Sequence, residues 1–481
     1  MSFLLFRCPK RLGYMRIRTL RATDPRSENE IKIQFSKGDL IADNFFSILI
    51  GENGTRKSQS LRDILDLSFT SITRLRQTGL AIENKSGTLT YWASKRAGSP
   101  YLPSKVIAVS GVATDRFPSR LSGRLRKNEV RYSREDRYHY IGPRSESNLV
   151  SRSQSLQEIV RMLIENYSKV SERQTALSAA FDVLPTSKGC LFNFRHNVEV
   201  KRGQCDVESL SYALHDGEPS KAKRFELAPE ELKQQVVLLM NSDFPLEVKL
   251  DLDDEDSTGI SPDFSAEVFA LALDCGAINV DDSYSLMPSG AQLPLSEFSS
   301  GQWHIFSSLL FVALAVENDA LILVDEPENS LHPHWQREYL TLFSKAVSSC
   351  EGVHVLVATH SPLVASALPQ NRAQVIRLSR TRYGNLVAKE LASGPFGWTA
   401  DDILEEVFAL PSTRSQLFAQ ELDRTLKLFA KGDRQNEELI QRVKKLVAFS
   451  SSLPEDDIAR GVIETLRTVI LPDAQAKARK K

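Results

Sequence analysis

A glycine-rich stretch that ends in lysine and serine is the first segment whose residue types suggest chemistry. It lies between an apolar run at 45–50 and a helical pattern at 58–67. Backbone N–H groups of small residues can wrap a phosphate at a helix start, a lysine can reach the terminal phosphates, and a serine hydroxyl can hold Mg²⁺. We expect the phosphate-binding residues to be Gly51, Asn53, Gly54, Thr55, Arg56, Lys57 and Ser58.

One position departs from this pattern, because Arg56 stands directly before Lys57, where a glycine is usual. A side chain there must either point away from the phosphates or intrude on them. If it points away, it adds positive charge near the terminal phosphates. Contacts that hold the ground state do not accelerate the reaction unless they strengthen in the transition state. We therefore expect tight nucleotide binding with slow turnover.

Two adjacent carboxylates, Asp325 and Glu326, follow the apolar run 321–324. Ligands of α/β sheets bind at the carboxyl ends of the strands. Asp325, with Ser58, is expected to hold Mg²⁺, and Glu326 to polarise an attacking water. Taken alone, the pair is as readily explained as two exposed carboxylates that close a strand.

Two further motifs complete the set. Ser299, Gly301 and Gln302 open a helical pattern, where free N–H groups and the positive end of the helix dipole suit a phosphate. His360 ends an apolar strand pattern, a place from which it could sense a terminal phosphate. Separately, the first is also a good helix cap and the second also a structural histidine. The order of the four motifs along the chain is more specific than any one of them alone.

In that order, the motifs resemble those of the ABC-type ATPases. The residue sequences of 325–333 and 359–362 are similar to those of the RecF/SMC-like branch rather than to those of membrane transporters. The resemblance covers 13–115 and 285–390. It implies ATP and Mg²⁺ as cofactors and an α/β fold, a P-loop NTPase of ABC type with a helical insertion and a C-terminal helical region.

The resemblance also implies roles for individual residues. Glu326 and His360 become the catalytic residues of an ATP hydrolase. Three residues act on the nucleotide held by a second subunit: Ser299, Gly301 and Gln302. The chain is then a homo-oligomer joined through ATP-sandwich head dimers, with the loop 329–332 against the partner.

The elements that must position these residues divide the chain into four parts. Residues 1–115 and 285–395 form the two lobes of the ATPase head, separated by a mostly helical insertion at 116–284 and followed by a helical region at 396–481. Helix and strand patterns alternate from 303 to 358, which indicates a parallel sheet. The glutamine that the family places after the strand at 106–110 cannot be located.

Composition excludes several classes of protein. The chain has 481 residues with 61 basic and 61 acidic side chains, so neither a globally basic coat protein nor an acidic disordered chain fits. The longest apolar run is too short to cross a bilayer, and we expect a cytoplasmic protein without membrane contact. The five scattered cysteines favour reduced packing residues over disulfides or a zinc site.

A basic stretch, Arg116–Arg152, is the candidate nucleic-acid contact. Four of its side chains are spaced closely enough to meet successive phosphates: Arg120, Arg124, Arg126 and Lys127. A solvated basic face, or an intramolecular partner for the acidic segment 251–256, explains the stretch equally well.

The helical region from about 396 is the candidate docking element for a partner. Apolar residues recur there at helical spacing in two groups, Ile403, Leu404, Val407 and Phe408, and Leu422, Leu426 and Phe429. The alternative is that both faces pack on the ATPase head.

The insertion has no heptads and no Cys-x-x-Cys hook, which argues against SMC-type cohesion and break-repair proteins. Segments 140–145 and 397–404 resemble the stand-alone ATPases of bacterial antiphage systems of the Septu type. That resemblance implies a separate HNH nuclease, whose DNA cleavage the nucleotide restrains or releases, and no nuclease site in this chain. Two alternatives are a RecF-like DNA-repair ATPase without a nuclease partner and a nucleotide sensor that barely hydrolyses ATP.

Overall fold

The computed structural model describes most of the chain. The described residues are 16–35, 44–69, 74–76, 79–84, 87–92, 102–118, 137–143, 152–198, 203–217, 219–242, 245–254, 258–261, 264–367, 372–391, 396–406, 414–454 and 457–471. Two compact units are present, Met1–Trp398 and Thr399–Lys481, and each is considered by itself.

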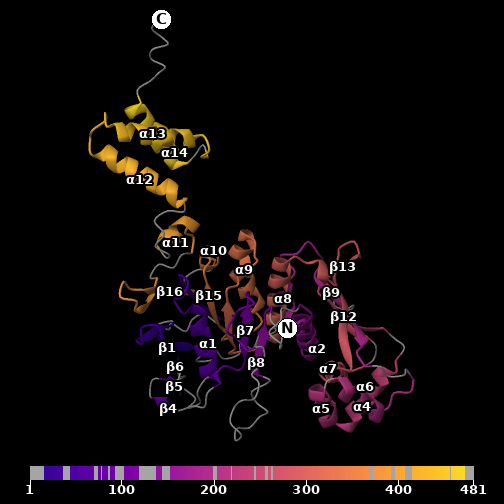
Figure 1. Cartoon of the computed structure of the whole chain (residues 1–481). Coiled ribbons are helices and arrows are strands. Elements are labelled where there is room, and N and C mark those ends of the chain that lie inside the picture. Colours follow the sequence, from indigo (N-terminus) through magenta and orange to yellow (C-terminus); the bar gives the residue numbers. More distant parts are fainter. Residues whose placement is uncertain are drawn as a thin grey trace, which may run out of the picture. The chain divides into compact units, whose positions relative to one another are not determined.

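A seven-stranded sheet forms the centre of the first unit (Figure 1). Its strand order is β17 (Leu386–Glu390), β16 (Ala373–Arg380), β3 (Phe45–Gly51), β15 (His354–Thr359), β14 (Leu321–Asp325), β7 (Val106–Ser110) and β8 (Tyr138–Ile141). All neighbours are parallel except β16 and β17. The carboxyl ends of β3, β14 and β15 therefore meet at one edge. This parallel α/β sheet, which carries a phosphate loop after β3, confirms the P-loop fold of ABC type.

Helix α1 (Lys57–Ser68) packs between this sheet and a second one. The second sheet has the order β2 (Glu30–Gln34), β1 (Ile17–Thr23), β6 (Gly87–Trp92), β5 (Gly79–Asn84) and β4 (Arg74–Arg76). One hydrophobic core joins residues of both sheets with α1, including Leu20, Leu61, Leu65 and Leu323. Burial of the apolar side of α1 fixes where the helix begins, and hence where the phosphate loop must turn.

The region expected to be a mostly helical insertion contains six α-helices and a third sheet. The helices are α2 (Arg152–Glu165), α3 (Gln174–Ser178), α4 (Val207–Gly217), α5 (Pro219–Leu227), α6 (Glu230–Met240) and α7 (Ala266–Asp274). The antiparallel sheet has the order β11 (Gly259–Ser261), β10 (Leu246–Asp251), β9 (Gly189–His196), β12 (Ile278–Leu286) and β13 (Gln292–Pro294).

Two details of this region differ from expectation. The helical pattern that begins at 152 does not continue as one helix, because α2 ends at Glu165 and is followed by short 3-10 turns and α3. Strand β8 lies within the sequence range of the insertion but extends the central sheet beside β7. Pairing with β7 satisfies backbone groups that would otherwise form a bare sheet edge, a tertiary effect that local patterning does not reveal.

The helix that follows the third sheet, α8 (Ser300–Ala315), is held at its carboxyl end by a buried arginine from the insertion. Arg173 Nη1 donates to the carbonyl oxygens of Ala313, at 3.1 Å, and Leu314, at 2.5 Å. The last carbonyls of a helix have no partner within the helix and carry the negative end of its dipole. Arg173, only 7% exposed, supplies both a donor and a compensating charge.

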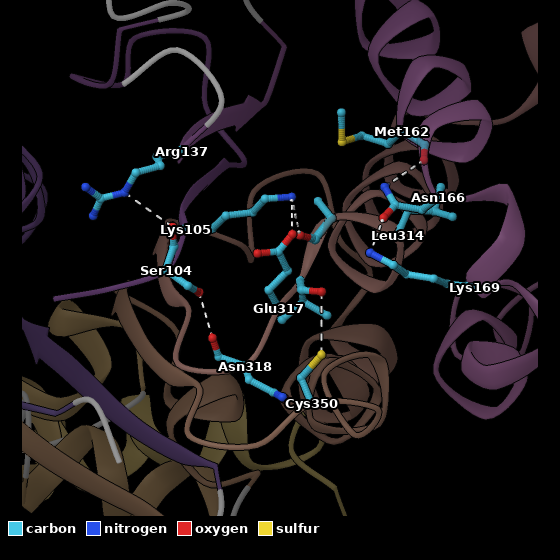
Figure 2. A network of polar contacts seen from close by, with 12 residues as sticks. Ser104, Lys105, Arg137, Met162, Asn166, Lys169, Leu314, Glu317, Asn318 and Cys350 are labelled. Carbon is cyan, nitrogen blue, oxygen red and sulfur yellow. Dashed lines mark hydrogen bonds and ion pairs between the residues drawn. The ribbon is translucent and has the colours of Figure 1, made fainter. Parts of the chain in front are cut away.

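A wider polar network surrounds this helix end at the amino edge of the central sheet (Figure 2). Lys105, just before β7, pairs with Glu317 at 2.9 Å, and its Nζ lies 3.4 Å from the carbonyl oxygen of Ala315. Asn318 accepts a hydrogen bond from the Ser104 hydroxyl through its carbonyl oxygen. These contacts connect the carboxyl end of α8 to the start of β7. The start of β7 lies at the amino edge of the sheet, opposite the edge that carries the phosphate loop.

The second unit is helical, as expected. It comprises α11 (Ala400–Glu406), α12 (Gln416–Ala430), α13 (Glu437–Ser450) and α14 (Ile458–Ile470). Leu439, Val443, Leu466 and Ile470 form a small core between α13 and α14. Of the two apolar groups expected to form faces, Phe429 packs against this core, whereas Leu426 is 38% exposed. Val407 and Phe408 lie outside the described residues.

The structure describes four of the five cysteines and the helices named above, but not all of the basic side chains. Cys190, Cys205, Cys275 and Cys350 are free and buried. Within the described helices, none is long and apolar enough to cross a membrane. The basic side chains proposed to meet phosphates, at 120, 124, 126 and 127, lie outside the described residues.

The contacts of Arg173 predict a stability effect. Arg173→Ala leaves two buried carbonyls without their charged donor, and we expect a loss of about 2 kcal/mol in the free energy of unfolding. Urea unfolding followed by tryptophan fluorescence measures it, because all four tryptophans precede residue 399. Arg337→Ala, an exposed arginine on α9 (Pro333–Ala346), is the matched control and should change little. Equal effects from the two variants would contradict the assignment.

Candidate functional site

The phosphate loop joins the end of β3 to the start of α1. Lys57, only 4% exposed, donates from Nζ to the carbonyl oxygens of Gly51, at 2.8 Å, and Glu52, at 3.0 Å. Burial lowers the pKa of Lys57 to about 8. Carbonyl oxygens thus hold the ammonium group inside the loop. Burial disfavours its charged form, and a bound phosphate would supply the opposite charge that stabilises it.

Arg56 lines the loop's cavity, and its guanidinium is held by neighbouring groups of the chain. Its backbone has φ 67 and ψ 18, in the left-handed region that favours glycine, which accounts for the glycine usual at this position. The guanidinium contacts Asp63 Oδ2 at 2.5 Å and also donates to the carbonyl oxygen of Thr23. Its charge is therefore paired with a nearly buried carboxylate of α1. The added positive charge expected at the phosphates is in this way largely compensated.

The carboxylate pair and the histidine meet at the edge of the sheet. β14 delivers Asp325, 2% exposed, and the next residue, Glu326, has φ 47 and a side chain that is 32% exposed. His360, directly after β15, lies with Nδ1 3.3 Å from Lys57 Nζ and Nε2 3.5 Å from Glu326 Oε1. Burial and the nearby Lys57 lower the pKa of His360 to about 4, so the ring is neutral at pH 7.

The surroundings of Asp325 fit a bound cation. Its Oδ1 is buried and has no hydrogen-bond partner in the described part of the chain, while Ser58 bonds to the same carboxylate. Burial raises the pKa of Asp325 to about 7. A carboxylate oxygen and a serine hydroxyl are hard oxygen ligands of the kind Mg²⁺ prefers. These two residues would hold the ion.

Most of the predicted residues share one cavity of about 550 Å³. Its lining includes Asn53, Gly54, Thr55, Arg56, Lys57, Ser58, Glu326 and His360. Gly51 contributes through its carbonyl oxygen to Lys57. The sequence therefore predicted which residues the structure brings together on this side of the site.

The signature residues Ser299, Gly301 and Gln302 are not among the described residues that line this cavity. Ser299 and Gln302 form a reciprocal capping box at the start of α8, with bonds of 3.2 and 2.9 Å. A Cβ on Gly301 would come within 2.5 Å of the carbonyl oxygen of Ser330. Only glycine allows α8 to approach the loop after β14 so closely.

Sequence reasoning missed several residues of the site. Asp63 is one, although its spacing from Gln59 on α1 places both on the same helix side, and Gln59 bonds to Asp63 at 2.9 Å. Arg380 of β16 is another, since it pairs with Asp24 at 2.8 Å and donates to the carbonyl oxygen of Gly54. The hydrogen bond from Arg380 is the main reason that the pKa of Asp24 falls to about 2.

Parts of the chain match known proteins. Residues 193–366 match the family described as "AAA domain, putative AbiEii toxin, Type IV TA system". Septu protein PtuA of Bacillus thuringiensis is 30% identical over 125 residues, 25% of this chain and 30% of PtuA. Protein ea59 of Escherichia phage lambda is 30% identical over 154 residues, 31% of this chain and 29% of that protein.

A third relative is a retron Vc95 probable ATPase of Vibrio cholerae serotype O1 biovar El Tor. It is 25% identical over 131 residues, 25% of this chain and 24% of that protein. The matched segments span less than a third of the length of each of these relatives. The chain resembles the SMC/RecF-like ABC-type ATPases, and a quarter of it resembles Septu protein PtuA.

The raised pKa of Asp325 predicts a proton linked to binding. Because the cation needs the carboxylate, Mg²⁺·ATP binding should expel the proton that the free chain holds below about pH 7, so affinity rises with pH up to that point and then levels. Titration calorimetry in two buffers of different ionisation enthalpy measures the release. The release from Asp325 should be large at pH 6 and small at pH 8.5, where Lys57, with a pKa of about 8, should instead take up a proton on binding. Asp325→Asn removes this contribution but not that of ATP itself, and identical proton release in the two chains would contradict the prediction.

Proposed function

We propose that this chain is an ABC-type ATPase whose nucleotide sites are completed by a second copy of itself. The observation that carries the proposal is the division of the motifs. The phosphate loop, Glu326 and His360 share one cavity, whereas the signature residues of the same chain, at 299, 301 and 302, lie outside its described lining. A second copy would bring its own signature to this cavity, with ATP between the two heads.

In the proposed reaction, backbone N–H groups of the loop and Lys57 bind the phosphates. Mg²⁺, held by Ser58 and Asp325, would neutralise the charge that develops on the transferred phosphoryl group. Glu326 orients the attacking water and accepts its proton, and the neutral ring of His360, between Lys57 and Glu326, contacts the terminal phosphate. One chain alone holds only half of each site, which favours slow turnover.

The similarity to PtuA supports a more specific role. We propose that the chain is the ATPase subunit of an antiphage system of the Septu type, in which ATP binding and slow hydrolysis control a separate HNH nuclease. Nucleic acid would be contacted through Arg116–Arg152, and the nuclease would dock on the second unit. Exposed apolar side chains there, Leu417 at 82% and Ile458 at 83%, support this placement.

Two substitutions test the ATPase. Glu326→Gln should bind ATP and form a lasting dimer, but lose at least about a hundredfold in hydrolysis, because the water is no longer activated. Lys57→Ala should lose affinity for ATP instead. Light scattering during size-exclusion chromatography reports the dimer, and phosphate release reports turnover. Hydrolysis by Glu326→Gln at the unmutated rate would remove Glu326 from the catalytic role.

A chain truncated after Trp398 tests the docking role of the second unit. It should remain folded and bind ATP, because the unit boundary falls there, but it should no longer co-purify with the proposed HNH nuclease partner. The full-length chain, co-expressed in the same way, is the control. Recovery of the nuclease with the truncated chain would place the docking surface elsewhere.

A further inference from the structure

The loop after β14 is fastened to the histidine segment after β15 by side chains outside the expected catalytic set. Glu328 Oε1 accepts a hydrogen bond of 2.5 Å from the backbone N–H of His360. Its other oxygen, Oε2, is buried without a hydrogen-bond partner in the described part of the chain, and burial raises the pKa of Glu328. Burial of this carboxylate costs free energy, and its hydrogen bond holds the backbone of His360 in position.

Gln336, from α9, makes the second connection. Its Oε1 accepts from the Ser361 hydroxyl at 2.7 Å, and its Nε2 donates to the carbonyl oxygen of Leu331 at 3.0 Å. The same amide therefore bonds to the residue after His360 and to the loop after Glu326. Because an amide side chain donates on one side and accepts on the other, it can link the two segments in a single orientation.

The other end of the loop contacts the elements that would face a second copy. Asn329 donates from Nδ2 to the carbonyl oxygen of Gly111, after β7, at 2.7 Å. The carbonyl oxygen of Ser330 lies against Gly301 at the start of α8, so closely that a Cβ there would come within 2.5 Å. A shift of residues 328–331 toward α8 would therefore press on Gly301 and disturb the signature.

We propose that Glu328 and Gln336 are positioning residues that form a brace, through which the nucleotide state sensed at His360 sets the position of loop 328–331 and of the signature. This inference rests on the proposed function, because it assigns a regulatory connection to the same site. His360 lies within 3.5 Å of both Lys57 and Glu326, so a bound phosphate would move or fix it. The brace passes that change to the surface offered to the second copy.

Hydrogen exchange of the full chain is the direct test. A non-hydrolysable ATP analogue should slow exchange both in peptides covering 357–363 and in peptides covering 327–337. In Gln336→Ala the first response should remain and the second should be lost. If Gln336 only stabilised the fold, its replacement would not abolish the response at 327–337 while leaving the response at 357–363. Glu338→Gln, an exposed residue on the same helix, should behave as the unmutated chain.

Turnover gives an independent readout. Glu328→Ala and Gln336→Ala should lower kcat by about tenfold or more while ATP affinity stays within about threefold, because small misplacements of catalytic groups are costly. Glu328→Gln keeps the acceptor for the N–H of His360, and it should retain most of the unmutated kcat. Equal losses in Glu328→Gln and Glu328→Ala would overturn the role of this hydrogen bond.

The unmutated chain keeps the proposal falsifiable even if the alanine variants fail to fold. Nucleotide binding with a response at 357–363 but none at 327–337 overturns the brace and leaves the proposed ATPase intact. Failure of the unmutated chain to bind ATP removes the proposed function and the brace together. Loss of both responses in Gln336→Ala at unchanged affinity also overturns the brace, because the first segment should respond on its own.

Discussion

Burial of charged groups at the carboxyl edge of the central sheet is the constraint on which the head depends. Strands β3, β14 and β15 are buried along almost their whole lengths, and their parallel pairing brings Lys57, Asp325 and His360 to one edge. Burial lowers the pKa of Lys57 and of His360 and raises that of Asp325, so each group is shifted toward its neutral form. A phosphate and a cation are the partners that would restore full charge to Lys57 and Asp325. The site is thus arranged in advance for a metal-bound nucleotide.

Helix α8 has a complementary role. Its carboxyl end is held by Arg173 of the insertion and by Lys105 before β7, and its amino end is closed by the capping box of Ser299 and Gln302. A helix fixed at both ends presents its first-turn N–H groups as a rigid anion-binding surface. Because those groups stand outside the described lining of their own chain's cavity, the proposed dimer would offer this surface to the nucleotide of the other copy. The insertion, through Arg173, is connected to this surface.

The motif strands were predictable from the sequence because their motif residues follow apolar runs in one characteristic order, although each motif alone has another explanation. The alternation of helix and strand patterns predicted the parallel sheet, and the motifs predicted many of the residues that share the cavity, but not Asp24, Asp63 or Arg380. Tertiary effects were not predictable. The pairing of Arg56 with Asp63, the addition of β8 to the central sheet and the brace of Glu328 and Gln336 all depend on contacts between segments that local patterns do not connect. The same limit applies to the third sheet, whose strands are separated by helices.

Mixing two inactive chains measures most directly whether two copies complete one site. Lys57→Ala cannot bind ATP in its own loop but keeps an intact signature. Ser300→Glu keeps the loop and places a negative charge at the exposed start of α8, where it suits the helix dipole but repels a phosphate from the partner. Each chain alone should be inactive, and the mixture should recover ATP hydrolysis, because a mixed dimer holds one complete site. A mixture that stays inactive although the two chains associate would contradict a site shared between copies.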